Sequence, residues 1–268
     1  MSKYWTLFQV ALQDAFSERG SAVIWAFLDF LSPMMMLFIW LAIFQGQAEQ
    51  GTTIGGFNLS QMLTYYFGVA FISAVATSHN EWDVARDIQS GELSMYLTRP
   101  LSYLGHQFIT NISWKLLKAV CITPFLILTF YLFRQYLAFD FSPFQLLMFF
   151  SVLALSYLLY FFNSMVFGLI PFWLEEYGSF IELNEMVRSL FSGQAIPIIF
   201  LPGAFLAFGQ FLPYRLFYDF PLTILSGRAT SSDLITGVFS QLIWLAFFIV
   251  LFRFLWRKGI ARYSAFGG

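Results

Sequence analysis

The chain has 268 residues, of which 59% are hydrophobic, 21% aromatic and only 11% charged. A soluble body of this size could not bury so much apolar surface, so the composition excludes an ordinary soluble enzyme, a disordered chain and a nucleic-acid binder. The 14 basic and 15 acidic residues nearly cancel and indicate no anionic partner, and the single cysteine, Cys121, excludes an intramolecular disulfide. The composition therefore predicts an integral membrane protein.

Residues 3–18 carry apolar side chains at helical spacing, with polar side chains on the opposite face. Trp5, Phe8, Ala15 and Phe16 belong to the apolar face. The pattern predicts an amphipathic helix that lies in the membrane interface. A helix packed on a soluble partner is the alternative.

Six later segments are long and apolar enough to cross a bilayer, which takes about 20 residues of helix. They are residues 22–44, 59–78, 112–133, 144–173, 189–210 and 234–252. The runs are continuous rather than alternating, which favours helices over β-strands. The first run follows acidic Asp14 and Glu18 and is too long for the core of a signal peptide. We expect an all-α membrane protein with one transmembrane domain over residues 1–268.

An even number of spans places both termini on the same side of the membrane. With the N-terminus in the cytoplasm, only Arg134, Arg215 and Arg228 of the 14 Lys and Arg residues lie outside. This asymmetry predicts cytoplasmic N- and C-termini. The loop after the fourth span fits less well, because Arg188 alone accompanies four glutamates. These are Glu175, Glu176, Glu182 and Glu185.

Residues 79–107 form the longest polar stretch on the cytoplasmic side. Trp82, Ala85 and Ile88 are spaced for one helical face, and Gly91 is a natural helix stop. A second short turn over 92–97 ends before Arg99-Pro100. The pattern is equally consistent with two short helices that present charges to the cytoplasm and with a solvated loop that only connects two spans.

Residues 197–233 are apolar yet rich in proline and glycine, a density that no straight helix survives. Backbone left unpaired in lipid is costly, so this segment must be shielded by protein or reach the headgroups. We expect the fifth span to bend outward after Ser192, followed by an outer re-entrant segment over 197–226. A simple aromatic belt is the alternative.

Asp29 is the clearest ionisable group inside a span, and such groups are functional candidates. It either reaches water or one of Lys115 and Lys118, or serves a substrate or a proton. The sequence has no nucleotide-binding P-loop, no metal-ligand spacing and no nucleophile motif. We therefore expect no enzyme activity and no cofactor or metal in this chain.

Two stretches resemble signatures of ABC-2 type transporter permeases. Residues 89–102, QSGELSMYLTRPLS, resemble the Gly-x-Leu…Leu…Pro-Leu-Ser signature of the first cytoplasmic loop, although Glu92 stands where many members have threonine. Residues 211–221, FLPYRLFYDFP, resemble the Leu-Pro…Pro pattern between spans five and six. Their order and spacing cover nearly the whole chain, and the nearest branch is that of bacterial permeases of this length whose ATPase is a separate chain.

The resemblance implies a permease subunit of an ATP-driven exporter in the bacterial cytoplasmic membrane. A second permease, identical or homologous, and P-loop ATP-binding subunits that use ATP and Mg²⁺ would complete the complex. The loop 79–107 would carry the coupling helix, with Glu81–Ile88 docked on the ATPase. The residues implied at this interface are Glu81, Asp83, Arg86, Asp87, Gly91, Glu92, Leu93, Arg99 and Pro100.

The substrate is less well defined by the sequence. The 36 Phe, 13 Tyr and 8 Trp residues are suited to an apolar or cation-binding pathway and equally to packing against lipid. Export of a hydrophobic or cationic small molecule is the first hypothesis, and export of a polysaccharide or lipid-linked glycan is the second. A stand-alone ion-coupled carrier that relies on Asp29, and a membrane enzyme or assembly scaffold, are alternatives from other classes.

Overall fold

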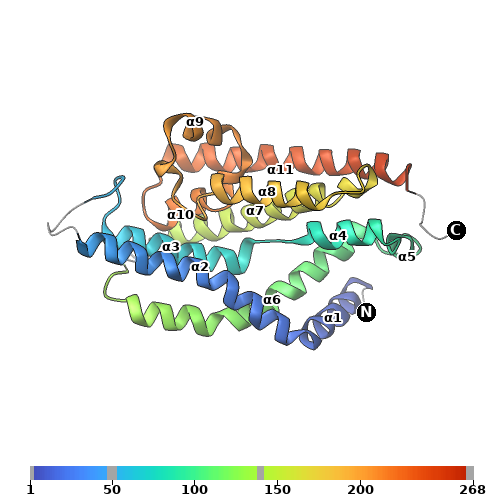
Figure 1. Cartoon of the computed structure of the whole chain (residues 1–268), viewed down its shortest axis with the longest axis horizontal. Coiled ribbons are helices and arrows are strands. Elements are labelled where there is room, and N and C mark those ends of the chain that lie inside the picture. The colour runs from blue at the N-terminus through green and yellow to red at the C-terminus, as the bar shows by residue number, and fades with distance from the viewer. Residues whose placement is uncertain (1–2, 47–52, 138–141, 264–268) are drawn as a thin grey trace.

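The computed structural model describes residues 3–46, 53–137 and 142–263, and every regular element in these ranges is a helix (Figure 1). The elements in chain order are α1 (Lys3–Ser17), α2 (Arg19–Gly46), α3 (Leu59–Ala76), α4 (Asn80–Gln89), α5 (Leu93–Leu97), α6 (Tyr103–Phe133), α7 (Pro143–Phe167), η1 (Ile170–Phe172), α8 (Gly178–Phe191), η2 (Ile198–Phe200), α9 (Gly203–Phe211), η3 (Pro213–Leu216), α10 (Asp219–Leu225) and α11 (Ser231–Ile260).

Within the described residues, five helical stretches are long and apolar enough to cross a membrane. They cover Arg19–Gly46, Leu59–Gln89, Tyr103–Phe133, Pro143–Phe172 and Ser231–Ile260. The predicted span over 189–210 is not among them, and its helix is interrupted: α8 ends at Phe191, next to the bend expected after Ser192, and α9 begins only at Gly203. Pro197 and Pro202 lie in this gap, where proline lacks the amide hydrogen that a helix requires.

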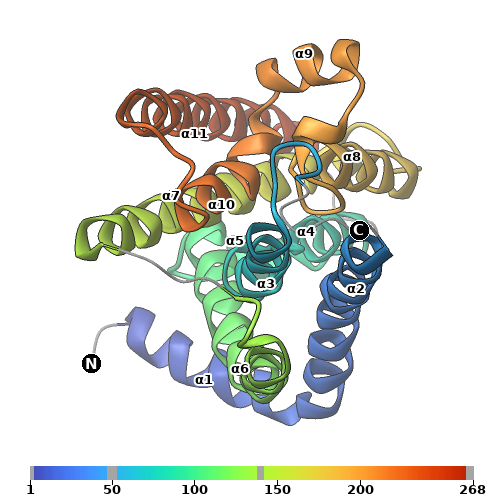
Figure 2. The same cartoon turned by 90° about the vertical axis from the view of Figure 1, so that its left-hand side faces the viewer.

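The helix α3 lies at the centre of the bundle, in contact with α2, α6, α7 and α10 (Figure 2). Buried side chains occupy every side of it, which suits its uniformly apolar sequence. Gly68 allows α10 to approach closely, since a Cβ atom there would lie 2.5 Å from Leu222 and 2.6 Å from Leu225. The helix α11 instead packs mainly on α7 and leaves Phe239, Phe247 and neighbouring apolar side chains exposed, as expected for a lipid-facing helix.

The helix α1 and the end of α11 lie at the same end of the molecule as α5 (Figure 1). In α1, Ala11 and Ala15 are buried while Trp5 and Phe16 are half exposed, and the helix packs along α6. The amphipathic segment predicted over 3–18 is thus helical, with its small residues facing the bundle. Its place in the membrane interface stays a prediction.

The chain between α8 and α10, residues 192–218, is called the broken segment here; it contains η2, α9 and η3, away from the α5 end (Figure 1). Two tyrosine hydroxyl groups of α3 donate hydrogen bonds to the backbone of the broken segment. Tyr65 donates to the Gly193 carbonyl at 2.7 Å, and Tyr66 donates to the Ala195 carbonyl at 3.0 Å. Gln241 of α11 donates to the Leu216 carbonyl at 3.2 Å. Neutral side chains thus satisfy backbone groups that the irregular chain leaves free.

Candidate functional site

The helical path through α3 and α4 is interrupted at residues 77–79, and Figure 1 shows the two helices following one another toward the α5 end. An interruption leaves carbonyl groups at the end of α3 without partners inside the helix. Lys115 of α6 donates to the Thr77 carbonyl, and Ser164 of α7 donates to the Ser78 carbonyl at 2.7 Å. The ammonium group also complements the negative end of the α3 dipole. The break is therefore held by two neighbouring helices.

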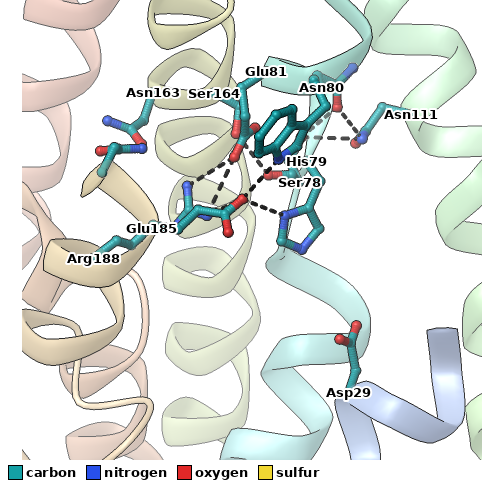
Figure 3. A network of polar contacts seen from close by, with 12 residues as sticks. Asp29, Ser78, His79, Asn80, Glu81, Asn111, Asn163, Ser164, Glu185 and Arg188 are labelled. Atoms are coloured by element: carbon teal, nitrogen blue, oxygen red, sulfur yellow. Dashed lines mark hydrogen bonds and ion pairs between the residues drawn. The ribbon is translucent and has the colours of Figure 1, made fainter. Parts of the chain in front are cut away.

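A network of neutral groups surrounds the start of α4 (Figure 3). The Ser78 hydroxyl donates to the Asn80 side-chain oxygen at 2.6 Å, and Asn111 of α6 donates to both residues. Tyr157 of α7 donates to Asn111 at 2.9 Å, and the Asn80 amide reaches Gln107 at 3.3 Å. These contacts fix the first turn of α4 to α6 and α7.

Glu81 and Arg188 form an ion pair in the interior, between α4 and α8 (Figure 3). Both guanidinium Nη atoms lie 3.4 Å from Glu81 Oε1, and the two side chains are 0% and 3% exposed. The guanidinium carbon lies 4.3 Å from the centre of the Tyr160 ring, a cation–π contact. A pair this deep avoids the cost of an isolated buried charge only while both partners are present.

Two further groups extend this pair toward the surface. Glu185 of α8 lies with Oε1 3.9 Å from Arg188 Nη2 and accepts a hydrogen bond from Trp82 Nε1 at 3.2 Å. His79 Nδ1 lies 3.7 Å from the same carboxylate oxygen, and its side chain is 51% exposed. The four charged or titratable side chains, His79, Glu81, Glu185 and Arg188, are called the α4–α8 cluster below.

Asp87 faces the bundle rather than solvent. Its carboxylate accepts hydrogen bonds from the Tyr103 hydroxyl at 2.6 Å and from the Gln107 amide at 3.1 Å. Leu93, in α5, is fully buried as well. Three of the sequence-predicted interface residues, Glu81, Asp87 and Leu93, are thus buried against helices of their own chain.

The remaining predicted interface residues lie at the surface of the α4–α5 region. Asp83 and Arg86 form an exposed pair at 2.9 Å. Gly91 separates α4 from α5 with φ of 84°, a conformation that favours glycine. Glu92 is exposed, and Arg99 lies 5.1 Å from the Tyr96 ring centre. The Pro100 carbonyl accepts a hydrogen bond from Lys3 Nζ at 2.7 Å, which joins the turn to α1.

Asp29 of α2 forms an ion pair with Lys118 of α6 and lies apart from the α4–α8 cluster (Figure 3). The carboxylate is 28% exposed and the lysine 13% exposed. The pairing is one of the two structural arrangements considered from the sequence. It gives Asp29 a role in holding α2 to α6.

Sequence reasoning did not select Arg188, Glu185, Tyr103 or Gln107 as site residues. One signal could have found Arg188, because it is the lone basic residue in a stretch with four glutamates. A second signal could have found the burial of Glu81, which lies four residues before Ala85 and seven before Ile88 on the same helical face. No sequence signal announces the partners of Asp87, since Tyr103 and Gln107 resemble ordinary residues of a span.

The architecture is that of a multi-pass α-helical membrane protein. The sequence matches the family described as "ABC-2 family transporter protein" over residues 30–267. The chain therefore belongs to the ABC-2 transporter family, the membrane components of ABC transporters, which generally pair with an ATP-binding subunit and typically have no ATPase site of their own. No match was found among curated proteins or among solved structures.

Proposed function

We propose that the chain is the permease subunit of an ATP-driven exporter and that α4 and α5 couple it to a separate ATP-binding subunit. The observation that carries the proposal is the division of α4 into two faces. One face is tied to α6 and α8 through Asp87 and Glu81, whereas the other presents Asp83 and Arg86 to solvent. A helix bound to the bundle on one side and charged on the other is suited to transmit a partner's movement.

A cavity of about 410 Å³ beside α4 supports the same assignment. It lies between α4, η1 and the end of α11, and Gln89, Glu175 and Arg262 supply its polar lining. A side chain of the ATP-binding subunit could enter it next to the exposed face of α4. Together, the cavity and that face form a mixed polar surface at the α5 end.

The proposal also assigns the two ends of the molecule to opposite sides of the membrane. The α5 end would face the cytoplasm of a bacterial cell together with both termini, and α8 with the chain that follows it would provide a sixth crossing. The broken segment and α10 would form the outer re-entrant cap, held by Tyr65, Tyr66 and Gln241. ATP and Mg²⁺ would be bound by the partner, and a second identical or homologous permease would complete the pathway.

The proposed substrate is a hydrophobic or cationic small molecule. Exposed aromatic side chains on α2, among them Trp25, Phe27 and Phe38, are compatible with this class because aromatic faces bind apolar groups and cations, and equally compatible with packing against lipid. Uptake of labelled test compounds into inverted vesicles, with and without ATP, distinguishes this class from glycan export.

The test of the coupling role begins with the ATPase that co-purifies with the tagged chain in mild detergent, identified by mass spectrometry. Arg86→Glu should then weaken the complex and reduce substrate-stimulated ATP hydrolysis. Arg134→Glu is the matched control, because Arg134 is also exposed but lies just after α6 ends, far from α5. Equal behaviour of the two variants would refute the coupling role of α4. Recovery of the chain without any ATPase, even after crosslinking in membranes, would refute the ATP-driven class.

A further inference from the structure

We propose that His79, Glu81 and Glu185 form a binding site for a divalent transition-metal ion, Zn²⁺ in the first place, between α4 and α8. One donor atom from each residue lies within 4.8 Å of the donor atoms of the other two. Figure 3 shows these side chains converging from the start of α4 and from α8. Ligand distances to such an ion are about 2.0–2.2 Å, and His79 and Glu185, the two partly exposed members, have side chains that can adjust toward it.

The buried carboxylate of Glu81 supplies the independent indication of a ligand. Its Oε1 atom faces the Arg188 guanidinium, but Oε2 is buried and has no hydrogen-bond partner among the residues that the structure describes. A buried acceptor without a partner is costly and calls for an explanation. A carboxylate that binds arginine through one oxygen and has a second, unpartnered oxygen retains the capacity to bind a metal ion.

The charges of the α4–α8 cluster also attract a cation. Glu81 and Glu185 carry two negative charges, whereas Arg188 carries one positive charge. The His79 imidazole lies beside Glu185, with Nδ1 at 3.7 Å from Oε1, and among the described residues no donor pairs with Glu81 Oε2. A metal ion would meet a net charge of −1 from the two glutamates and Arg188 and would partner the unpaired oxygen.

The donor set defines the class of ion. Neutral imidazole and carboxylate oxygens suit Zn²⁺ and related divalent transition metals, whereas Ca²⁺ and Mg²⁺ prefer oxygen ligands alone. The half-exposed His79 leaves a fourth position accessible to water. A bound ion would link the start of α4 to α8 and so restrain α4. This role goes beyond the coupling role proposed above, and ion binding can be measured without a transport assay.

The experiment is a calorimetric titration of the purified full chain with Zn²⁺ in detergent, after removal of metals with a chelator and without a polyhistidine tag. Titration with Co²⁺, followed by its visible absorption, reports the coordination directly. We expect one ion per chain and an increase in thermal unfolding temperature on binding. His79→Ala and Glu185→Gln should each weaken binding by about 10-fold or more, because each removes a direct ligand.

The chain offers a matched control for each variant. His106→Ala removes the only other histidine, and Glu182→Gln neutralises an exposed glutamate of the same helix α8; both should bind Zn²⁺ like the parent chain. Absence of binding by the parent chain would overturn the proposal. Equal affinities of His79→Ala and His106→Ala, or of Glu185→Gln and Glu182→Gln, would also overturn it. Neither outcome bears on the ATPase partner, so the proposed function stands or falls separately.

Discussion

Two interruptions of the helical backbone, residues 77–79 and the broken segment, are stabilised by different chemistry. At residues 77–79 some of the neighbouring groups are charged. Lys115 donates a hydrogen bond to the Thr77 carbonyl, and the Glu81–Arg188 pair lies about one helical turn further along the chain. In the broken segment the partners are neutral, chiefly the hydroxyl groups of Tyr65 and Tyr66. Buried charges are stable only in complete sets, whereas neutral hydrogen bonds can be lost one at a time at modest cost. The first region is therefore expected to change as a unit, whereas the second can lose single contacts independently.

The largest expected effect comes from removing one member of the buried pair. Arg188→Met should lower the free energy of unfolding by about 3–5 kcal/mol, because it leaves the Glu81 carboxylate buried without its counter-charge. The measurement is unfolding of the purified chain in detergent, followed by circular dichroism. Arg134→Met, at an exposed position, is the control and should change stability little.

The double variant Glu81→Gln with Arg188→Met tests the cause of that loss. Neutralising both partners removes the uncompensated charge, so most of the lost stability should return. A double variant that is less stable than Arg188→Met alone would show that packing of the two side chains, and not their charge, maintains the contact between α4 and α8.

A smaller effect is expected in the broken segment, at Gly193. Its φ is 85°, and a Cβ atom there would lie 2.5 Å from the Tyr65 hydroxyl oxygen. Gly193→Ala should cost about 1–2 kcal/mol for the left-handed backbone and about 1–3 kcal/mol more for the crowded side chain. Gly227 is the matched position, with φ of 67° and no atom within 4 Å of a Cβ. Equal losses in the two alanine variants would mean that Tyr65 does not constrain the segment.

A still smaller loss of stability is expected when one neutral hydrogen bond of the broken segment is removed. Tyr65→Phe removes a single donor and leaves the Gly193 carbonyl unpaired, so it should cost about 1–3 kcal/mol. Tyr131→Phe removes a hydroxyl from a side chain that is 62% exposed and should cost much less. Thermal unfolding of the two variants side by side separates the hydrogen bond from the loss of a hydroxyl as such.

The two regions also differ in how far the sequence predicts them. Length and apolarity are local properties, so hydropathy finds the five long helices. It does not indicate the helix α8, because Glu182, Glu185 and Arg188 make that stretch polar, whereas the residues after Phe191 are apolar but not α-helical until α9. The pairing of Arg188 with Glu81 offsets part of that polarity, and the residues are 107 positions apart in the chain.

In α4, likewise, the sequence does not predict which side chains are buried. Helical spacing predicts two short helices in residues 79–107 as one of two alternatives, and α4 and α5 are present. The sequence shows four charged residues between 81 and 87 but does not indicate which of them are buried. The structure separates them by face, with Glu81 and Asp87 inside and Asp83 and Arg86 outside. Which face turns inward depends on α6, α7 and α8, and therefore on tertiary packing.

The smallest expected effect on stability concerns the exposed pair, Asp83 and Arg86, whose side chains are 58% and 66% exposed. Arg86→Ala should change the free energy of unfolding by less than about 1 kcal/mol, and added salt should reduce even that difference. A loss as large as that of Arg188→Met would contradict the division of α4 into a buried and an exposed face. If stability is unchanged while stimulation of the partner's ATP hydrolysis falls, the exposed charges act on the partner. A residue that holds its own helix in place would instead lower both quantities together.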